Sequence, residues 1–199
     1  MTGSHVFLVG PRGSGKSTVA RLLAADLGMP WVDADELLER RAGLTIRDIF
    51  AIEGEAGFRQ REAEVLAELC SLTAHVIATG GGVVLRPDNR DLLRRSGVVV
   101  WLTGDIDTLG GRITADAPTT ERRPTLTVGG SAEVAELVAA REPLYRECAN
   151  VTIDTSGRTP EEIVAEVRAR LEKRTNHRGT EKEENEWDTD RTERADERG

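Results

Sequence analysis

Short apolar runs alternate with longer stretches of helical periodicity along most of this chain. An apolar run bounded by turn residues predicts a buried strand, and apolar positions that recur every three or four residues predict an amphipathic helix. Alternating strands and helices indicate βαβ units, so we expect an α/β fold with a five-stranded parallel sheet between layers of helices. The predicted strands are residues 5–9, 30–33, 75–79, 97–102 and 150–153, and the predicted helices are residues 15–27, 35–42, 45–53, 55–72, 88–95, 105–112, 132–147 and 160–172.

Several predicted helices carry start and stop signals of their own. Thr159 precedes Pro160, and Glu162 lies where it completes a capping box with the Thr159 hydroxyl. Gly28 and Gly43 each follow a helical stretch, at a position where a left-handed residue ends a helix. The last predicted helix should therefore begin at Pro160, and two others should end at these glycines.

Two segments do not fit the alternating pattern. Residues 114–130 mix Pro, Gly, Thr and Arg without periodicity and include two adjacent arginines. Because a long loop in a compact domain is usually functional or disordered, we expect a mobile lid there. Residues 173–199 are highly charged, and Trp187 is the only large apolar side chain among them. We expect one folded domain over residues 1–172 and a charged, disordered tail over residues 173–199.

Composition and charge narrow the classes of function. The 199 residues carry a formal net charge of -8, so the chain lacks the broad basic character that binds nucleic acid. The longest early apolar run, Val6–Val9, is too short for a signal-peptide core or a membrane span. We expect a cytoplasmic monomer that binds neither nucleic acid nor membrane. Cys70 and Cys148 lie far apart without metal-ligand spacing, which favours reduced thiols in the core.

Residues 10–17 read GPRGSGKS and match the phosphate-binding pattern G-x-x-x-x-G-K-[ST]. The pattern follows a predicted strand and precedes a predicted helix, as a P-loop requires. Glycines let successive backbone N–H groups point toward phosphate oxygens, and the helix N-terminus adds a positive dipole. In this interpretation Lys16 reaches the β- and γ-phosphates of ATP, and Ser17 binds Mg²⁺. The alternative, a glycine-rich turn with an exposed lysine, is a poorer explanation of the flanking elements.

Two carboxylates follow the second predicted strand, at the edge of the sheet where open α/β folds bind ligands. Asp33 is a candidate to hold the hydration shell of Mg²⁺. Asp35 is a candidate to accept a hydrogen bond from a substrate hydroxyl and to direct that hydroxyl toward the γ-phosphate. Asp35 would serve equally well as the N-cap of the helix that follows.

Three further features have both a structural and a functional interpretation. Arg59 lies one turn before Glu62, and this spacing alone favours a surface ion pair over a clamp for a substrate carboxylate. Three consecutive glycines at residues 80–82 end a predicted strand, which favours close approach of a ligand over a plain turn. Arg141 precedes Pro143, which should kink or break the helix, and on this pattern alone Arg141 is a solvated charge.

The motifs GPRGSGKS, DAD, FRQRE, TGGG, a loop arginine before proline and REPLY occur in an order that resembles the shikimate kinase family. Many NTPases share the P-loop, but the order of the other motifs is far more specific. The resemblance covers residues 6–172 and implies the three-layer P-loop kinase fold. It also implies a reaction in which ATP, with Mg²⁺ as cofactor, phosphorylates the 3-hydroxyl of shikimate. The products are shikimate 3-phosphate and ADP, on the chorismate route to aromatic amino acids.

The resemblance assigns roles that spacing alone does not. It implies that Asp35 contacts the ring hydroxyls, and that Arg59 and Arg141 grip the carboxylate. Phe50 and Phe58 would line an apolar wall against the ring. The implied catalytic residues are Lys16, Asp35 and Arg123. The implied nucleotide contacts are Gly13, Ser14, Gly15, Lys16, Ser17, Thr18, Arg112, Arg123 and Pro160. The implied acceptor contacts are Asp35, Arg59, Gly80, Gly81, Gly82 and Arg141, and the implied metal ligands are Ser17 and Asp33.

Two departures from the family pattern concern the lid. The lid arginine is assigned to Arg123 because it precedes Pro124, but Arg122 is adjacent and leaves two choices. Gly110 and Gly111 interrupt a predicted helix just before the lid, which indicates either a hinge or an early helix end.

Two other functions remain open at this point. Another hydroxy-acid kinase of the P-loop class, such as a gluconate kinase, would use many of the same residues. A non-catalytic module that senses shikimate would bind the acid without turnover. Such a module is expected to lack one of four residues, all of which are present here: Lys16, Ser17, Asp33 and Asp35.

Overall fold

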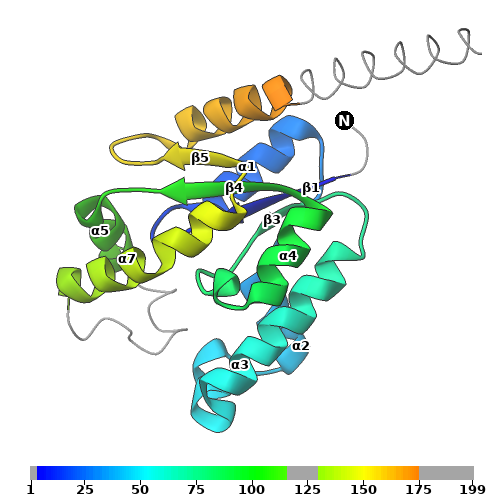
Figure 1. Cartoon of the computed structure of the whole chain (residues 1–199), viewed down its shortest axis with the longest axis vertical. Coiled ribbons are helices and arrows are strands. Elements are labelled where there is room, and N and C mark those ends of the chain that lie inside the picture. The colour runs from blue at the N-terminus through cyan, green and yellow to red at the C-terminus, as the bar shows by residue number, and fades with distance from the viewer. Residues whose placement is uncertain (1–3, 116–129, 175–199) are drawn as a thin grey trace, which may run out of the picture.

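The computed structural model describes residues 4–115 and 130–174, and its centre is a parallel sheet of five strands (Figure 1). The strands are β1 (His5–Val9), β2 (Trp31–Asp33), β3 (Val76–Ala78), β4 (Gly97–Thr103) and β5 (Val151–Asp154). They lie in the order β2-β3-β1-β4-β5, and every pairing is parallel. The α/β prediction is confirmed, and each strand end agrees with its predicted position to within one residue.

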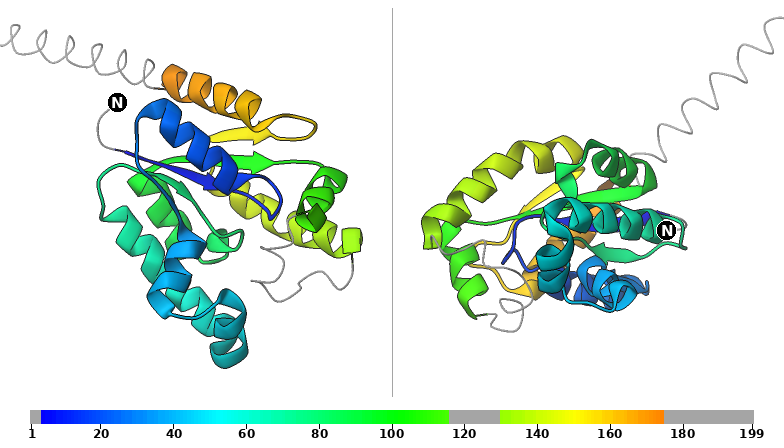
Figure 2. Two further views of the ribbon diagram at one scale, coloured as in Figure 1. Left: turned by 180° about the vertical axis from the view of Figure 1, so that it is seen from behind. Right: turned by 90° about the horizontal axis from the view of Figure 1, so that it is seen from below.

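Helices cover both faces of this sheet, so the molecule has the expected three layers (Figure 2). Side chains alternate along β1: Phe7 and Val9 enter a core with α2, α3, α4 and α7, whereas Val6 and Leu8 enter a core with α1 and the last helix. The helices are α1 (Lys16–Leu27), α2 (Ala34–Ala42), α3 (Ile46–Cys70), α4 (Pro87–Ser96), α5 (Ile106–Ala115), α7 (Gly130–Cys148) and a last helix over residues 160–174, with a 3-10 turn, η1 (Val83–Leu85).

The predicted helix boundaries are confirmed where capping chemistry marks them. The Thr159 N–H donates to Glu162 Oε2 at 2.9 Å, and the Glu162 N–H donates to Thr159 Oγ1 at 3.3 Å, which completes the capping box before Pro160. α1 and α2 end at Gly28 and Gly43, both in the left-handed conformation.

Glycine and proline inside helices act differently from one helix to the next. Gly54 has φ 68° and ψ -174°, so α3 consists of two helical segments that meet at a kink, as the two predicted helices implied. α5 continues through Gly110 and Gly111, so an early helix end there is wrong. α7 is not broken at Pro143. The turn η1 was not predicted, because three residues are too few to show a period.

The predicted lid and tail fall largely beyond the described residues. α5 extends to Ala115 and α7 begins at Gly130, so both ends of the predicted lid are helical. The last helix includes residues 173 and 174, two residues past the predicted start of the tail. Residues 116–129, with Arg122 and Arg123, and residues 175–199 lie outside the described ranges.

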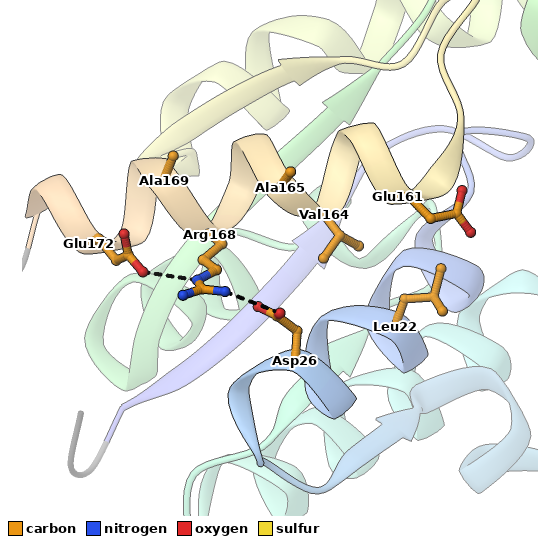
Figure 3. A pocket seen from close by; sticks show the side chains of 8 residues that line it. All are labelled: Leu22, Asp26, Glu161, Val164, Ala165, Arg168, Ala169 and Glu172. Atoms are coloured by element: carbon orange, nitrogen blue, oxygen red, sulfur yellow. Dashed lines mark hydrogen bonds and ion pairs between the residues drawn. The ribbon is translucent and has the colours of Figure 1, made fainter.

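A groove of about 540 Å³ separates α1 from the last helix (Figure 3). Apolar side chains line part of it, and Arg168 bridges Asp26 and Glu172 along it, at 3.3 and 2.9 Å. None of the candidate site residues lines this groove. The groove therefore lies outside the predicted site. Within residues 4–115 and 130–174, none of the helices combines the length and apolar character that a membrane span requires.

Candidate active site

The loop between β1 and α1 has the backbone shape of a phosphate-binding loop. Gly10, Gly13 and Gly15 all have positive φ, at 144°, 79° and 84°. A Cβ on Gly10 would overlap the carbonyl oxygen of Leu102, so the loop packs too closely on β4 for any side chain at that position. Because α1 begins at Lys16, the N-terminal end of its dipole faces this loop. The geometry is that of an anion site.

Lys16 lies back across its own loop. Its Nζ donates to the carbonyl oxygens of Gly10 and Pro11 at 2.9 and 2.8 Å, and the side chain is half-buried. Ser14 is fully buried, with its hydroxyl donating to the same Pro11 oxygen at 2.9 Å. The turn is therefore braced from within, and Lys16 is not the exposed lysine of a plain glycine-rich turn.

The predicted metal ligands meet at the start of α1. Ser17 Oγ donates to Asp33 Oδ2 at 2.5 Å, which joins α1 to the end of β2. Hydroxyl and carboxylate oxygens are hard ligands of the type that Mg²⁺ binds. No group of three His, Cys, Asp or Glu side chains in the described ranges is suited to hold a metal. This pair fits a cation that keeps water and phosphate oxygens as its other ligands, which is the usual environment of Mg²⁺.

The N-cap of α2 is Asp33 and not Asp35. Asp33 Oδ1 accepts hydrogen bonds from the N–H groups of Asp35 and Glu36 at 3.0 and 3.3 Å. The interpretation of Asp35 as a cap is therefore wrong. Its side chain belongs to the first turn of α2.

The three glycines that follow β3 form a buried turn against both halves of the site. A Cβ on Gly80 would lie 2.7 Å from Glu62 Oε1 and 2.9 Å from Asp35 Oδ1. A Cβ on Gly82 would overlap the guanidinium of Arg59. The turn therefore has carboxylates at its first residue and a cation at its third.

Arg59 is held inside the protein and not on its surface. Its side chain is 15% exposed, and its Nη1 donates to Glu62 Oε2 at 2.9 Å. The surface ion pair that the spacing favoured is wrong, because α3 turns both side chains toward the Gly80–Gly82 turn. Arg59 also lies 5.0 Å above the ring of Phe58, which adds a cation–π contact.

Glu62 is a buried carboxylate with one oxygen lacking a hydrogen-bond partner among the described residues. Its side chain is 6% exposed, and Oε1 is the oxygen that faces Gly80. Burial raises the pKa of Glu62, and the positive charges of Arg59 and Arg141 oppose this effect. An unpaired buried acceptor in a polar cluster is typical of a site that receives a donor from a ligand.

Arg141 joins this cluster from α7 and is half-buried, not solvated. Its charge acts on Glu62 and also on Tyr145, one helical turn further along α7. The Tyr145 hydroxyl donates to the carbonyl oxygen of Gly81 at 2.5 Å. α3, α7 and the glycine turn therefore converge on one polar centre.

An apolar wall and a nucleotide-side loop complete the arrangement. The rings of Phe50 and Phe58 pack with centroids 4.6 Å apart on either side of the α3 kink. Arg112 of α5 donates to Thr155 Oγ1 at 3.0 Å and to the Thr155 carbonyl at 2.9 Å. It also reaches the Gly13 carbonyl at 3.5 Å, so it links the P-loop to the loop that leads to Pro160.

Comparisons with known proteins agree with this geometry. A sequence model of the shikimate kinase family matches residues 12–172. A shikimate kinase from Rhodopirellula baltica is 48% identical over 164 residues, which cover 82% of this chain and 88% of that protein. The chain belongs to the shikimate kinase family.

Solved structures support the family fold. The structure of a shikimate kinase from Acinetobacter baumannii in complex with shikimate has a TM-score of 0.78 and 41% identity, and covers 83% of this chain and 91% of that one. A gluconokinase from Sinorhizobium meliloti has a TM-score of 0.61 at 20% identity, and covers 90% of this chain and 98% of that one. The second likeness shows the shared fold alone.

Within this shikimate kinase fold, the described residues include all the predicted site positions except Arg123. Ser17 and Thr18 are exposed at the start of α1, and the Gly80–Gly82 turn is buried. Sequence reasoning assigned Tyr145 no role, although it lies four residues after Arg141. That spacing places the two side chains on one face of a helix and was the available signal.

Proposed function

We propose that this chain transfers the γ-phosphoryl group of ATP to the 3-hydroxyl of shikimate, giving shikimate 3-phosphate and ADP. The observation that carries the proposal is the polarity of the Gly80–Gly82 turn. Its first residue lies between the carboxylates of Asp35 and Glu62, and its third lies against the Arg59 guanidinium. A hydroxy acid placed along this turn finds hydrogen-bond acceptors for its hydroxyls at one end and a cation for its carboxylate at the other.

The P-loop lies beside this turn, as a transfer between two bound substrates requires. A Cβ on Gly81 would lie 3.4 Å from the Gly10 carbonyl oxygen and 3.7 Å from the Arg12 nitrogen. The backbone of the acceptor turn and the backbone of the phosphate loop are therefore in direct contact. This contact supports in-line transfer between ligands held on either side of it.

On the nucleotide side, we assign phosphate binding to the backbone of residues 13–18 and to Lys16. The Lys16 ammonium would exchange the carbonyl oxygens of Gly10 and Pro11 for phosphate oxygens. Arg112 and Pro160 would flank the adenine, and Arg123 would close over the phosphates. Ser17 and Asp33 would hold Mg²⁺, which supplies positive charge next to the phosphate oxygens.

On the acceptor side, Arg59 and Arg141 would bind the carboxylate, and Asp35 would accept a hydrogen bond from the reacting hydroxyl. The hydroxyl oxygen would form its bond to the γ-phosphorus as the bond to the β,γ-bridging oxygen breaks and ADP leaves, and the hydroxyl proton would pass to the Asp35 carboxylate. Because such transition states are loose, positioning and neutralisation of charge account for most of the rate. Asp35 directs the oxygen, and Lys16 and Arg123 balance the negative charge.

The test is ADP release from the purified protein with ATP and Mg²⁺, comparing shikimate, quinate, gluconate and no acceptor. Stimulation by shikimate alone is the expected result. Stimulation by gluconate instead would replace shikimate with another hydroxy acid. No stimulation by any acceptor, with ATP and shikimate both bound, would favour the sensing module. A Lys16→Met variant is the negative control, since it removes the phosphate-binding cation and should abolish turnover.

We also propose that the enzyme works as a monomer in the cytoplasm, where ATP is available. The P-loop, the Gly80–Gly82 turn and Arg59 converge within one chain, which supports the monomer. Sedimentation at working concentration tests the monomer, and cell fractionation tests the compartment. Loss of activity on dilution into monomers would contradict the proposal that the enzyme works as a monomer.

A further inference from the structure

Tyr145 is a buried polar side chain that the roles proposed above leave unexplained. It is 1% exposed, and its ring stacks on Trp101 of β4 with centroids 5.9 Å apart and an interplanar angle of 19°. Its hydroxyl donates to the Gly81 carbonyl oxygen at 2.5 Å. The ring is therefore fixed by the sheet, while the hydroxyl is fixed on the acceptor turn.

The bond from Tyr145 acts on one peptide unit of that turn. A trans peptide is planar, so the carbonyl of Gly81 and the N–H of Gly82 point in opposite directions. When Tyr145 holds the carbonyl toward α7, the Gly82 N–H must point away from α7. The Cα of Gly82 lies against the Arg59 guanidinium, because a Cβ there would overlap it. The hydrogen bond from Tyr145 therefore fixes the direction of the Gly82 N–H, next to the Arg59 guanidinium.

A second contact prevents the peptide from turning. The position that a Gly81 Cβ would take is 3.4 Å from the Gly10 carbonyl oxygen and 3.8 Å from the Tyr145 hydroxyl. The P-loop backbone and Tyr145 therefore bound Gly81 together. Without the hydroxyl, the P-loop contact alone would have to fix the plane of the peptide.

We propose that Tyr145 is a positioning residue for the substrate carboxylate, because it orients the Gly82 N–H to bind the same group as Arg59. This inference rests on the proposed function, in which Arg59 binds the carboxylate of shikimate. Arg141 lies against the Tyr145 hydroxyl from the same helix, so the second arginine of the clamp is held at the same point. Tyr145 itself does not touch the substrate.

The test is the steady-state kinetics of Tyr145→Phe, which keeps the ring on Trp101 and removes only the hydroxyl. We expect the KM for shikimate to rise roughly five- to tenfold, the range for loss of one hydrogen bond. The KM for ATP should stay unchanged, and kcat should change less than the KM for shikimate. A purely structural role would lower the melting temperature without this separation of the two substrates.

Cys148→Ala is the matched control on the same helix. Cys148 is 1% exposed, and its thiol makes weak hydrogen bonds to the backbone carbonyls of Leu144 at 3.3 Å and Tyr145 at 3.5 Å, so this variant leaves the Tyr145 hydroxyl in place. This variant should lower the melting temperature at least as much as Tyr145→Phe and leave the KM for shikimate unchanged. An equal rise in the KM for shikimate in both variants would overturn the proposal.

A double-mutant cycle with Arg59→Lys tests whether the effect acts through the carboxylate. If Tyr145 and Arg59 serve the same group, the loss of kcat/KM in the double variant is smaller than the product of the two single losses. Strictly multiplicative losses, or no effect of Tyr145→Phe, would refute the positioning role. A wild-type protein that does not turn over shikimate would instead refute the proposed function.

Discussion

Arg59 holds two glutamates through different edges of its guanidinium. Its Nη1 donates to Glu62 Oε2 at 2.9 Å, whereas its Nε and Nη2 both donate to Glu55 Oε1, at 3.3 and 3.2 Å. The Glu62 side chain is 6% exposed, and that of Glu55 is 65% exposed. The buried glutamate therefore fixes the arginine, and the exposed one occupies the paired N–H groups that suit a carboxylate.

Replacing Arg59 with alanine should act on the acceptor and not on the nucleotide. Because the Arg59–Glu62 pair is largely buried, we expect kcat/KM for shikimate to fall by roughly two orders of magnitude, as when one partner of a buried charge pair is removed. The KM for ATP should change less than twofold. Arg61→Ala is the control. Arg61 lies two residues after Arg59, pairs with Glu53 and has a side chain that is 38% exposed. Equal losses for ATP and shikimate would argue against a carboxylate clamp.

Replacing Glu55 with glutamine should improve shikimate binding. Glu55 carries the same functional group as the substrate carboxylate and occupies the Nε and Nη2 edge of Arg59, so the two compete. We expect the KM for shikimate to fall about two- to fivefold, the range for loss of an exposed ion pair. Titration of the variant with shikimate, followed by ADP release, measures the change. Glu53→Gln removes the same charge nearby and should have no effect, and a higher KM in Glu55→Gln would show that Glu55 supports Arg59 instead of competing with substrate.

Local sequence patterns were enough to predict the framework of the fold. Strands and helices depend on neighbouring residues, so the alternation of apolar runs located all five strands to within one residue. The capping box at Thr159 and the kink at Gly54 are likewise properties of short segments. These features follow from backbone chemistry within a few positions.

The site was harder to predict because its contacts join distant segments. Spacing along α3 shows that Arg59 and Glu62 are neighbours, but only packing against the glycine turn shows that they are buried. Tyr145 and Gly81 are separated by 64 positions, so no periodicity connects them. α2 is capped by Asp33 and not by Asp35. Sequence patterns do not decide between the two, because they locate a helix start only to within one or two residues. The resemblance to a family implied roles for Asp35 and Arg59 where spacing left or favoured simpler ones, but it implied none for Tyr145.

Alanine substitutions in two glycines should separate the site from the fold. Gly82 has φ -99° and ψ 0°, which alanine tolerates, and its added Cβ would meet the movable end of Arg59. Gly82→Ala should therefore displace the guanidinium from Glu62, so that the melting temperature falls moderately while kcat/KM for shikimate falls about tenfold or more, as for one lost charged hydrogen bond. Gly10 has φ 144° and faces the Leu102 carbonyl, so Gly10→Ala should lower the free energy of unfolding by about 2 kcal/mol. Thermal unfolding and kinetics of both variants decide the point, and a stable, fully active Gly82→Ala would place Arg59 elsewhere.

The ionisation of Tyr145 offers a spectroscopic test of its burial. Burial raises the pKa of Tyr145 from its ordinary value of 10.0 to about 12, and Arg141 only partly opposes this. Because the chain contains one tyrosine, the ultraviolet absorption of the phenolate reports on this residue alone. Tyr145 of the native protein should therefore titrate about two pH units above Tyr145 of the protein in denaturant, because only the folded state raises its pKa.

The sign of the linked stability change follows from which state binds the proton more tightly. Folded Tyr145 keeps its proton above the pH at which the unfolded chain loses it, so its contribution to stability is complete below pH 10.0 and is lost as pH rises toward about 12. Unfolding in urea between these values should show that decline, and Tyr145→Phe should lack the tyrosine component. A native tyrosine that titrates at its ordinary pKa would mean that the hydroxyl is hydrated, and the bond to Gly81 that orients the acceptor turn would then be absent.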